Sequence, residues 1–210
     1  MRDRRRANGL DEGDVLKGLA AGLIGGLVAS WTMNQFQALW SKLAEEKSQD
    51  KQTSARGSQQ EGEQEGQQSQ RSGPVQQGSQ HSEQQAQGDG EEQTDATVKT
   101  ASAISEGLFD HKLTKGEKKI AGPAVHYAFG TAVGGLYGAV TELAPEVSAG
   151  AGLPFGAVFW LVADETALPL LGLSKGPTEY PLSTHAYALA SHFVYGLTAD
   201  VVRRTVRGAL

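Results

Sequence analysis

The stretch LPFGAVFWLVADETALPLLGL, residues 153–173, decides the fold predicted for this chain. It is about the length that a helix needs to cross a hydrocarbon core of roughly 30 Å. Apolar residues fill it except near the middle, where Asp164 and Glu165 are neighbours. Two carboxylates in lipid cost much free energy, so we expect them to be protonated or to face protein, water or a counter-charge. The stretch predicts a transmembrane helix with a polar site at mid-depth.

Pro169 adds an irregularity to this helix. Proline has no backbone N–H, so the carbonyl four residues earlier, that of Glu165, loses its helical partner. The acidic pair and a freed carbonyl therefore coincide at one level of the predicted helix.

The composition averages two unlike parts. Residues 41–95 are dominated by Gln, Gly, Ser and Glu, whereas the rest of the 210-residue chain is rich in Ala, Gly, Leu and Val. A segment with so few aliphatic side chains cannot offset the entropy lost on ordering, so we predict a disordered loop there. The net charge of −5, without a basic patch, argues against a nucleic-acid partner. The absence of cysteine excludes disulfides, thiolate metal sites and thiol catalysis.

Three more apolar segments complete the predicted architecture: residues 15–40, 120–143 and 182–202. Glycines recur every fourth residue in the first of them, a spacing that permits close approach of membrane helices. Residues 96–119 are predicted to form an amphipathic interfacial helix and a basic linker. We predict an all-α, four-helix transmembrane bundle with a long disordered loop between helices 1 and 2. A soluble or peripheral helical protein is the alternative, because the segments are only moderately hydrophobic.

Both ends of the chain, residues 1–14 and 203–210, are rich in arginine. Four spans place both ends on one side, and the positive-inside rule assigns that side to the cytoplasm. We therefore predict a multi-pass membrane protein with both termini cytoplasmic. Besides the lipid bilayer, the expected partner is a second copy or another membrane protein, since four spans enclose little volume.

Polar residues in the predicted helices are expected to meet at three depths. At the midplane we expect Asp164 or Glu165 to pair with His192. The outer level is predicted to hold His185, His126 and Asn34. The inner face is predicted to hold a second group: Glu142, Asp200, Lys17 and Arg203. A structural network and a functional site are both open interpretations of the midplane acids.

No P-loop, H-E-x-x-H or G-x-G-x-x-G motif occurs, and we predict no catalytic residue, metal site or cofactor. The leading hypothesis is a non-enzymatic membrane protein that acts through helix packing or a protein partner. One alternative is proton-linked transport or pH sensing, because the pKa of histidine lies near pH 6.5 and responds to a neighbouring carboxylate. The other is a metal- or haem-binding subunit, which requires His185 or His192 to converge with His126 or an acid.

Several short segments carry a resemblance to a known family: HYAFG at 126–130, the acid-then-proline step from Glu142 to Pro145, PLLGL at 169–173, and His192 followed by Arg203 and Arg204. Together with residues 17–42 and the rest of 96–207, they make the chain resemble the YagU-like family of bacterial inner-membrane proteins. The resemblance implies a small multi-span protein of the plasma membrane. It supplies no catalytic residue.

Overall fold

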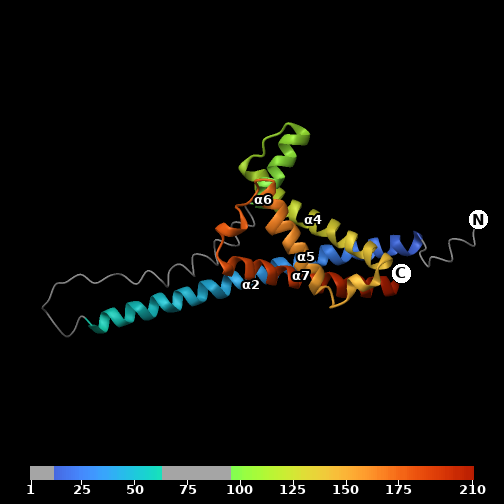
Figure 1. The fold of residues 1–210 in the computed structure, drawn as a ribbon. Helices are drawn as coiled ribbons and strands as arrows, with labels where there is room; N and C mark the ends of the chain where they lie inside the picture. The colour runs from blue at the N-terminus through green and yellow to red at the C-terminus, as the bar shows by residue number, and fades with distance from the viewer. Residues whose placement is uncertain (1–11, 63–95) are drawn as a thin grey trace, which may run out of the picture.

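The structure is a computed structural model that describes residues 12–62 and 96–210, with side chains described for 12–47 and 96–210. Its described parts are helical and contain no strand. The long helices are α2 (Glu12–Gly62), α4 (Lys115–Leu143) and α7 (Leu182–Ala209). Helix α2 packs against both α4 and α7, and α5 (Leu153–Val162) packs against α7 (Figure 1). The all-α prediction is confirmed.

The first helix is longer than predicted. It begins at Glu12 and continues past Trp40 to Gly62, so the predicted loop of 41–95 is wrong for residues 41–62. Those residues are mostly Ala, Glu, Lys, Gln, Arg and Ser and contain no proline. Such residues lose little freedom in a helix, so nothing in the sequence ends α2 at the polar boundary. The remainder of the predicted loop, 63–95, and residues 1–11 lie outside the described residues.

The predicted interfacial segment 96–119 divides into two parts. Residues 96–109 are helical, the chain turns at Asp110 with φ of 50°, and α4 begins at Lys115 rather than Ile120. The start of α4 is a capping box: Thr114 Oγ1 accepts from Glu117 N, and the Glu117 carboxylate accepts from Thr114 N at 2.7 Å. This cap places the predicted basic linker inside the first turns of α4.

The stretch 153–173 forms one helical path of three parts. After α5 comes a π-helical turn, η2 (Ala163–Ala167), and then the short α6 (Leu168–Leu170). In η2, Leu168 N donates to Ala163 O, five residues earlier. Pro169 can donate nothing to Glu165 and its ring crowds that carbonyl, which favours the wider turn just before it. The irregular turn contains both carboxylates.

Short 3₁₀ helices lie on either side of this path. The link from α4 to α5 contains η1 (Pro145–Ser148), and the link from α6 to α7 contains η3 (Pro177–Glu179). The chain leaves α6 through Gly172, which has a φ of 70°. The two links turn α5 back against α7, so that η2 lies beside the first half of α7.

Helices α2 and α4 approach each other at their glycines. A Cβ added to Gly134 would lie 2.4 Å from Gly26 Cα, and one added to Gly22 would lie 2.3 Å from Gly134 O. Any side chain at these positions would push the two helices apart. The predicted four-residue spacing therefore coincides with a backbone-to-backbone contact.

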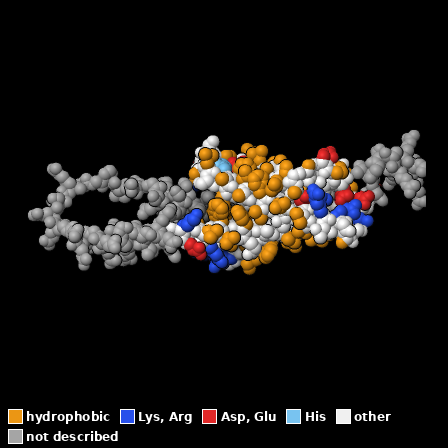
Figure 2. Space-filling model, turned by 90° about the horizontal axis from the view of Figure 1, so that it is seen from below, with side chains coloured by type: hydrophobic (Ala, Val, Ile, Leu, Met, Phe, Trp, Pro, Cys, Tyr) orange, Lys and Arg blue, Asp and Glu red, His pale blue; other side chains and the backbone are white. Residues whose placement is uncertain are grey.

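The distribution of apolar side chains is the reverse of that in a water-soluble bundle. Small or polar residues fill the interior, among them Ala21, Ala29, Ser30 and Ser191. Large apolar side chains lie outside: Leu136 is 63% exposed and Leu161 is 53% exposed. Figure 2 shows them covering the middle of the molecule, with charged side chains toward both of its ends.

Two helical segments in the described ranges are long and apolar enough to cross a membrane, Glu12–Lys47 and Leu153–Leu170. The predicted spans 120–143 and 182–202 do not qualify, so four transmembrane helices are not confirmed. Residues 120–143 contain five glycines, and residues 182–202 contain Ser, Thr, Tyr, His and Asp side chains. These residues lower the mean hydropathy of the two segments even though Leu136 and Val201 are exposed.

Candidate functional site

The two carboxylates of η2 reach two histidines on one face of α7. Glu165 Oε1 lies 2.6 Å from His185 Nδ1, and Asp164 Oδ2 lies 3.7 Å from His192 Nδ1. The histidines are seven residues apart and thus share a helix face. Adjacent acids in η2 therefore contact positions two turns apart on α7.

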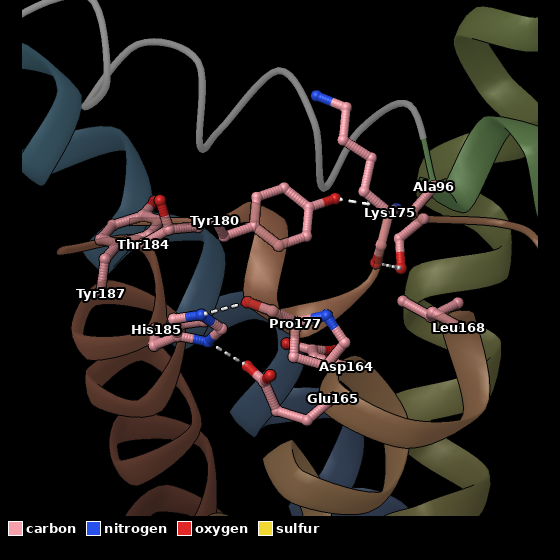
Figure 3. A pocket seen from close by; sticks show the side chains of 12 residues that line it. Ala96, Asp164, Glu165, Leu168, Lys175, Pro177, Tyr180, Thr184, His185 and Tyr187 are labelled. Carbon is pink, nitrogen blue, oxygen red and sulfur yellow. Dashed lines mark hydrogen bonds and ion pairs between the residues drawn. The ribbon is translucent and has the colours of Figure 1, made fainter. Parts of the chain in front are cut away.

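The Glu165–His185 contact was not predicted. The sequence placed His185 at an outer level with His126 and Asn34, and the structure instead gives it Glu165 as a partner. His185 Nε2 also lies 3.0 Å from the carbonyl oxygen of Pro177 in η3 (Figure 3). Both ring nitrogens of His185 thus lie within hydrogen-bond distance of an oxygen atom, and the side chain joins η2 to the loop before α7.

The Asp164–His192 contact is the pair expected at mid-depth. His192 is 3% exposed, and its Nδ1 donates to the carbonyl oxygen of Ala188 at 2.9 Å. That nitrogen must carry the proton, because a carbonyl only accepts. The distance of 3.7 Å to Asp164 is therefore an electrostatic contact and not a second full hydrogen bond. Phe159 packs edge-on against the same ring at 5.1 Å between centroids.

His126 and Asn34 do not join this network. Asn34 Nδ2 donates to the Tyr127 hydroxyl at 3.1 Å, linking α2 to α4. His126, the neighbour of Tyr127, points to a different side of α4, and its Nε2 is buried without a hydrogen-bond partner. The three residues predicted for the outer level therefore form no common network of contacts, because side chains at adjacent helical positions diverge by about 100°.

The predicted inner-face group forms with different partners. Asp200 accepts from Arg203 at 3.0 Å, from Arg204 at 2.7 Å and from the Tyr137 hydroxyl at 3.0 Å. Glu142 pairs with Arg207, a residue that the sequence interpretation missed; Arg207 also binds Asp14, with both distances at 2.8 Å. Lys17 is exposed and lies outside this cluster. The arginine-rich end of α7 was the sequence feature from which an ion pair of Arg207 could have been predicted.

Two cavities adjoin the carboxylates. The smaller, about 80 Å³, lies between η2 and the start of α7 and is lined by both carboxylates and His185 (Figure 3). The larger, about 480 Å³, is bounded by α2, residues 96–109, α4, the α5–α6 path and α7. Asp164 and Leu168 line both cavities, so Asp164 stands on the wall between them. The larger cavity extends from Asp164 and His192 to His126.

Residues 172–176, GLSKG, fit the G-x-S-x-G pattern of serine hydrolases, which the sequence interpretation overlooked. The pattern serves catalysis on a strand-to-helix turn with the serine beside a base. Here it follows α6, and Ser174 Oγ donates to the Lys175 carbonyl oxygen at 3.3 Å. His185 lines the same small cavity, but its Nε2 faces Pro177 O. The serine and the histidine are not arranged as a nucleophile and its base.

Within the described ranges, no group of three or more His, Asp or Glu side chains has the arrangement that a metal ion needs. The observed polar contacts are pairs: one acid with one histidine on α7, twice. They can hold or exchange a proton, and they fix η2 against α7.

Residues 105–201 match the model of a family described as "Protein of unknown function (DUF1440)". The matched segment contains α4, the α5–α6 path and most of α7, and hence both acid–histidine contacts. No curated protein and no solved structure matches the chain. The matched family is described as one of unknown function, so the match supplies no role for these contacts.

Proposed function

We propose that the chain is an integral membrane protein without enzymatic activity, which acts through helix packing or a protein partner in the bilayer. The observation that carries the proposal is the reversed polarity of the bundle, with large apolar side chains outside and small or polar ones inside. Soluble monomers rarely expose apolar patches this extensive. The two helical segments long enough to cross a membrane give further support.

The proposal includes four spans, although α4 and α7 are the less apolar helices. Both pack along α2, which is itself a candidate span, so helices beside it occupy the same layer. Their hydropathy is lowered mainly by residues that face other helices, such as Gly134 and Ser191, whereas Leu136 and Leu197 face outward. The resemblance to YagU-like proteins of the bacterial inner membrane belongs to the same proposal.

The orientation follows from the arginines. The beginning of α2 and the end of α7 lie at one end of the bundle, where Arg207 binds Asp14 (Figure 1). The cluster of arginines at this end assigns it to the cytoplasm. Gly116, at the start of α4, then lies on the opposite side.

Membrane fractionation tests the proposal. We expect the chain to stay in the membrane pellet after a sodium carbonate wash and to be released by detergent. Because the chain has no cysteine, Gly116→Cys and Gly208→Cys report on orientation separately, and both glycines have open space around a Cβ. An impermeant maleimide should label Gly116→Cys in intact cells and Gly208→Cys only after permeabilisation. Release by carbonate alone would refute membrane integration, and the opposite labelling would reverse the orientation.

Proton-linked transport or sensing is a second candidate, motivated by the acid–histidine contacts beside the two cavities. Asp164, His126, His192 and Tyr195 are titratable groups that line the larger cavity, and Glu165 lines the smaller one. Proteoliposomes with a pH-sensitive dye should show proton flux that Asp164→Asn abolishes. Flux no greater than that of empty liposomes between pH 5 and 8 would remove this candidate.

A further inference from the structure

We infer that the larger cavity binds an amphipathic molecule that has one aliphatic chain and a terminal hydroxyl or carboxyl group. Its volume of about 480 Å³ falls in the range of small-molecule sites, roughly 300–1,000 Å³. Protein interiors hold few voids larger than a water molecule, and an empty apolar void loses packing contacts. An occupant would restore these contacts.

The lining indicates an aliphatic body. Its walls are mostly Ala, Leu, Ile, Val, Met and Phe side chains from five segments of the chain. Water needs two to four polar partners in such a space, and the lining offers few. The cavity rim includes Ile104, Phe129 and Leu171, which are all more than a third exposed. The opening therefore faces the apolar outer surface, from which a membrane-dissolved molecule can enter.

The polar group of the ligand is indicated by His126 and His192. His126 Nε2 is buried, lacks a hydrogen-bond partner and belongs to a residue that lines the cavity. An unsatisfied buried nitrogen is costly, so an occupant that bonds it gains affinity. His192 donates its Nδ1 proton to Ala188, which leaves Nε2 as an acceptor in the neutral ring. A hydroxyl or carboxyl group can both donate and accept, and thus suits either nitrogen.

The inference rests on the proposed membrane location only for the source of the ligand. The two can fail separately. A chain released by carbonate refutes the location, whereas a carbonate-resistant chain without a selective site refutes the ligand.

The test uses the full chain in phospholipid nanodiscs and dodecanoic acid that carries a diazirine in its chain. Unlabelled dodecan-1-ol, dodecylamine or dodecane is added as competitor before illumination. The labelled peptides are mapped after illumination. We expect labels on the cavity-lining residues of α4 and the α5–α6 path. Dodecan-1-ol should compete at least about tenfold better than dodecane, the effect of one hydrogen bond in a buried site.

Two variants and a control make the test specific. Ala167→Trp fills the cavity and should abolish the labelling of its lining. His126→Phe keeps a ring but removes Nε2, and should reduce the preference for dodecan-1-ol over dodecane. His111→Phe makes the same change at an exposed position outside the cavity and should preserve that preference. Circular dichroism checks that each variant keeps its helices.

Labels spread evenly over outward-facing residues would overturn the inference, as would equal competition by dodecan-1-ol and dodecane in the wild type. Stronger competition by dodecylamine would identify Asp164 as the recognition group and overturn the assignment to a hydroxyl or carboxyl. If Ala167→Trp fails to fold, the competition ratio in His126→Phe decides the question alone.

Discussion

At the residue scale, Asp200 is the most fully bonded carboxylate of the described residues. It is 1% exposed and accepts from Tyr137, Arg203 and Arg204. Asp164, on the other wall of the bundle, has only the 3.7 Å contact with His192 and stands between two cavities. The first environment fixes a carboxylate in place, whereas the second leaves one able to respond to a ligand or a proton.

Asp200→Ala should lower the free energy of unfolding by about 3 kcal/mol, because it leaves the buried Arg203 without its counter-charge. Denaturation in detergent micelles measures this change. Glu146→Ala is the control, since Glu146 is exposed, and should change stability by less than about 0.5 kcal/mol. Equal effects of the two substitutions would show that the Asp200 cluster contributes no special stability.

At the element scale, the glycine contact of α2 with α4 sets how closely these helices approach. Gly134→Ala should destabilise the bundle by about 1–3 kcal/mol, because its methyl group would overlap Gly26 and force the backbones apart. Gly116→Ala is the matched control in the same helix, where a Cβ meets nothing within 4 Å. Thermal unfolding of both variants provides the comparison, and a neutral Gly134→Ala would contradict the close packing.

The capping box of α4 predicts a pH dependence outside the bundle. The backbone N–H of Thr114 holds the pKa of Glu117 below its ordinary value of 4.5, with help from the Thr114 hydroxyl and His111. A lowered folded pKa stabilises the cap fully above pH 4.5, and this contribution is lost as the pH falls through the lowered pKa. The protection factor for hydrogen exchange at the first turn of α4, which is the exchange rate corrected for its intrinsic pH dependence, should therefore fall under acid. Glu117→Gln should remove that dependence, and an unchanged profile would refute the role of the cap.

The π turn at 163–167 shows how one element creates the candidate site. In a regular helix Asp164 and Glu165 would continue the α5 register, and Pro169 would still lack a bond to Glu165. The wider turn absorbs this defect and directs the two acids toward His192 and His185. Structure and candidate site thus depend on the same irregularity.

At the scale of the whole molecule, Arg207 joins three long helices at one end. It binds Asp14 of α2 and Glu142 of α4 from its position on α7. Its side chain is a quarter exposed, so the expected contribution is modest. The cluster lies at the start of α2 and the end of α7, at one end of the bundle.

Arg207→Gln should lower the free energy of unfolding by about 1 kcal/mol or less at low salt, with a smaller effect at high salt because exposed charges are screened. Lys17→Gln removes the same charge at the same end, from an exposed residue outside the cluster, and should have no salt-dependent effect. Unfolding in detergent at two salt concentrations distinguishes them. Identical behaviour of both variants would show that the three-helix connection is not stabilising.

Much of the helical fold could be predicted from local chemistry. The apolar stretches, the glycine spacing and the proline beside the acidic pair are properties of neighbouring residues, and the helices appear where those properties predicted them. The end of α2 was wrong because polarity was used to indicate a loop, whereas Ala, Glu, Lys and Gln favour a helix whether or not it is buried.

The sequence by itself thus determined that the chain is helical, that its first helix carries closely spaced glycines, and that two carboxylates sit within a later helix. Each of these properties depends on residues that are only a few positions apart in the sequence. Tertiary structure alone decided which partners meet: Glu165 with His185, Glu142 with Arg207, and His126 with the larger cavity. The choice of partner depends on the rotation and offset of whole helices, because a shift of one residue changes the direction of a side chain by about 100°. In this chain it also depends on the π turn.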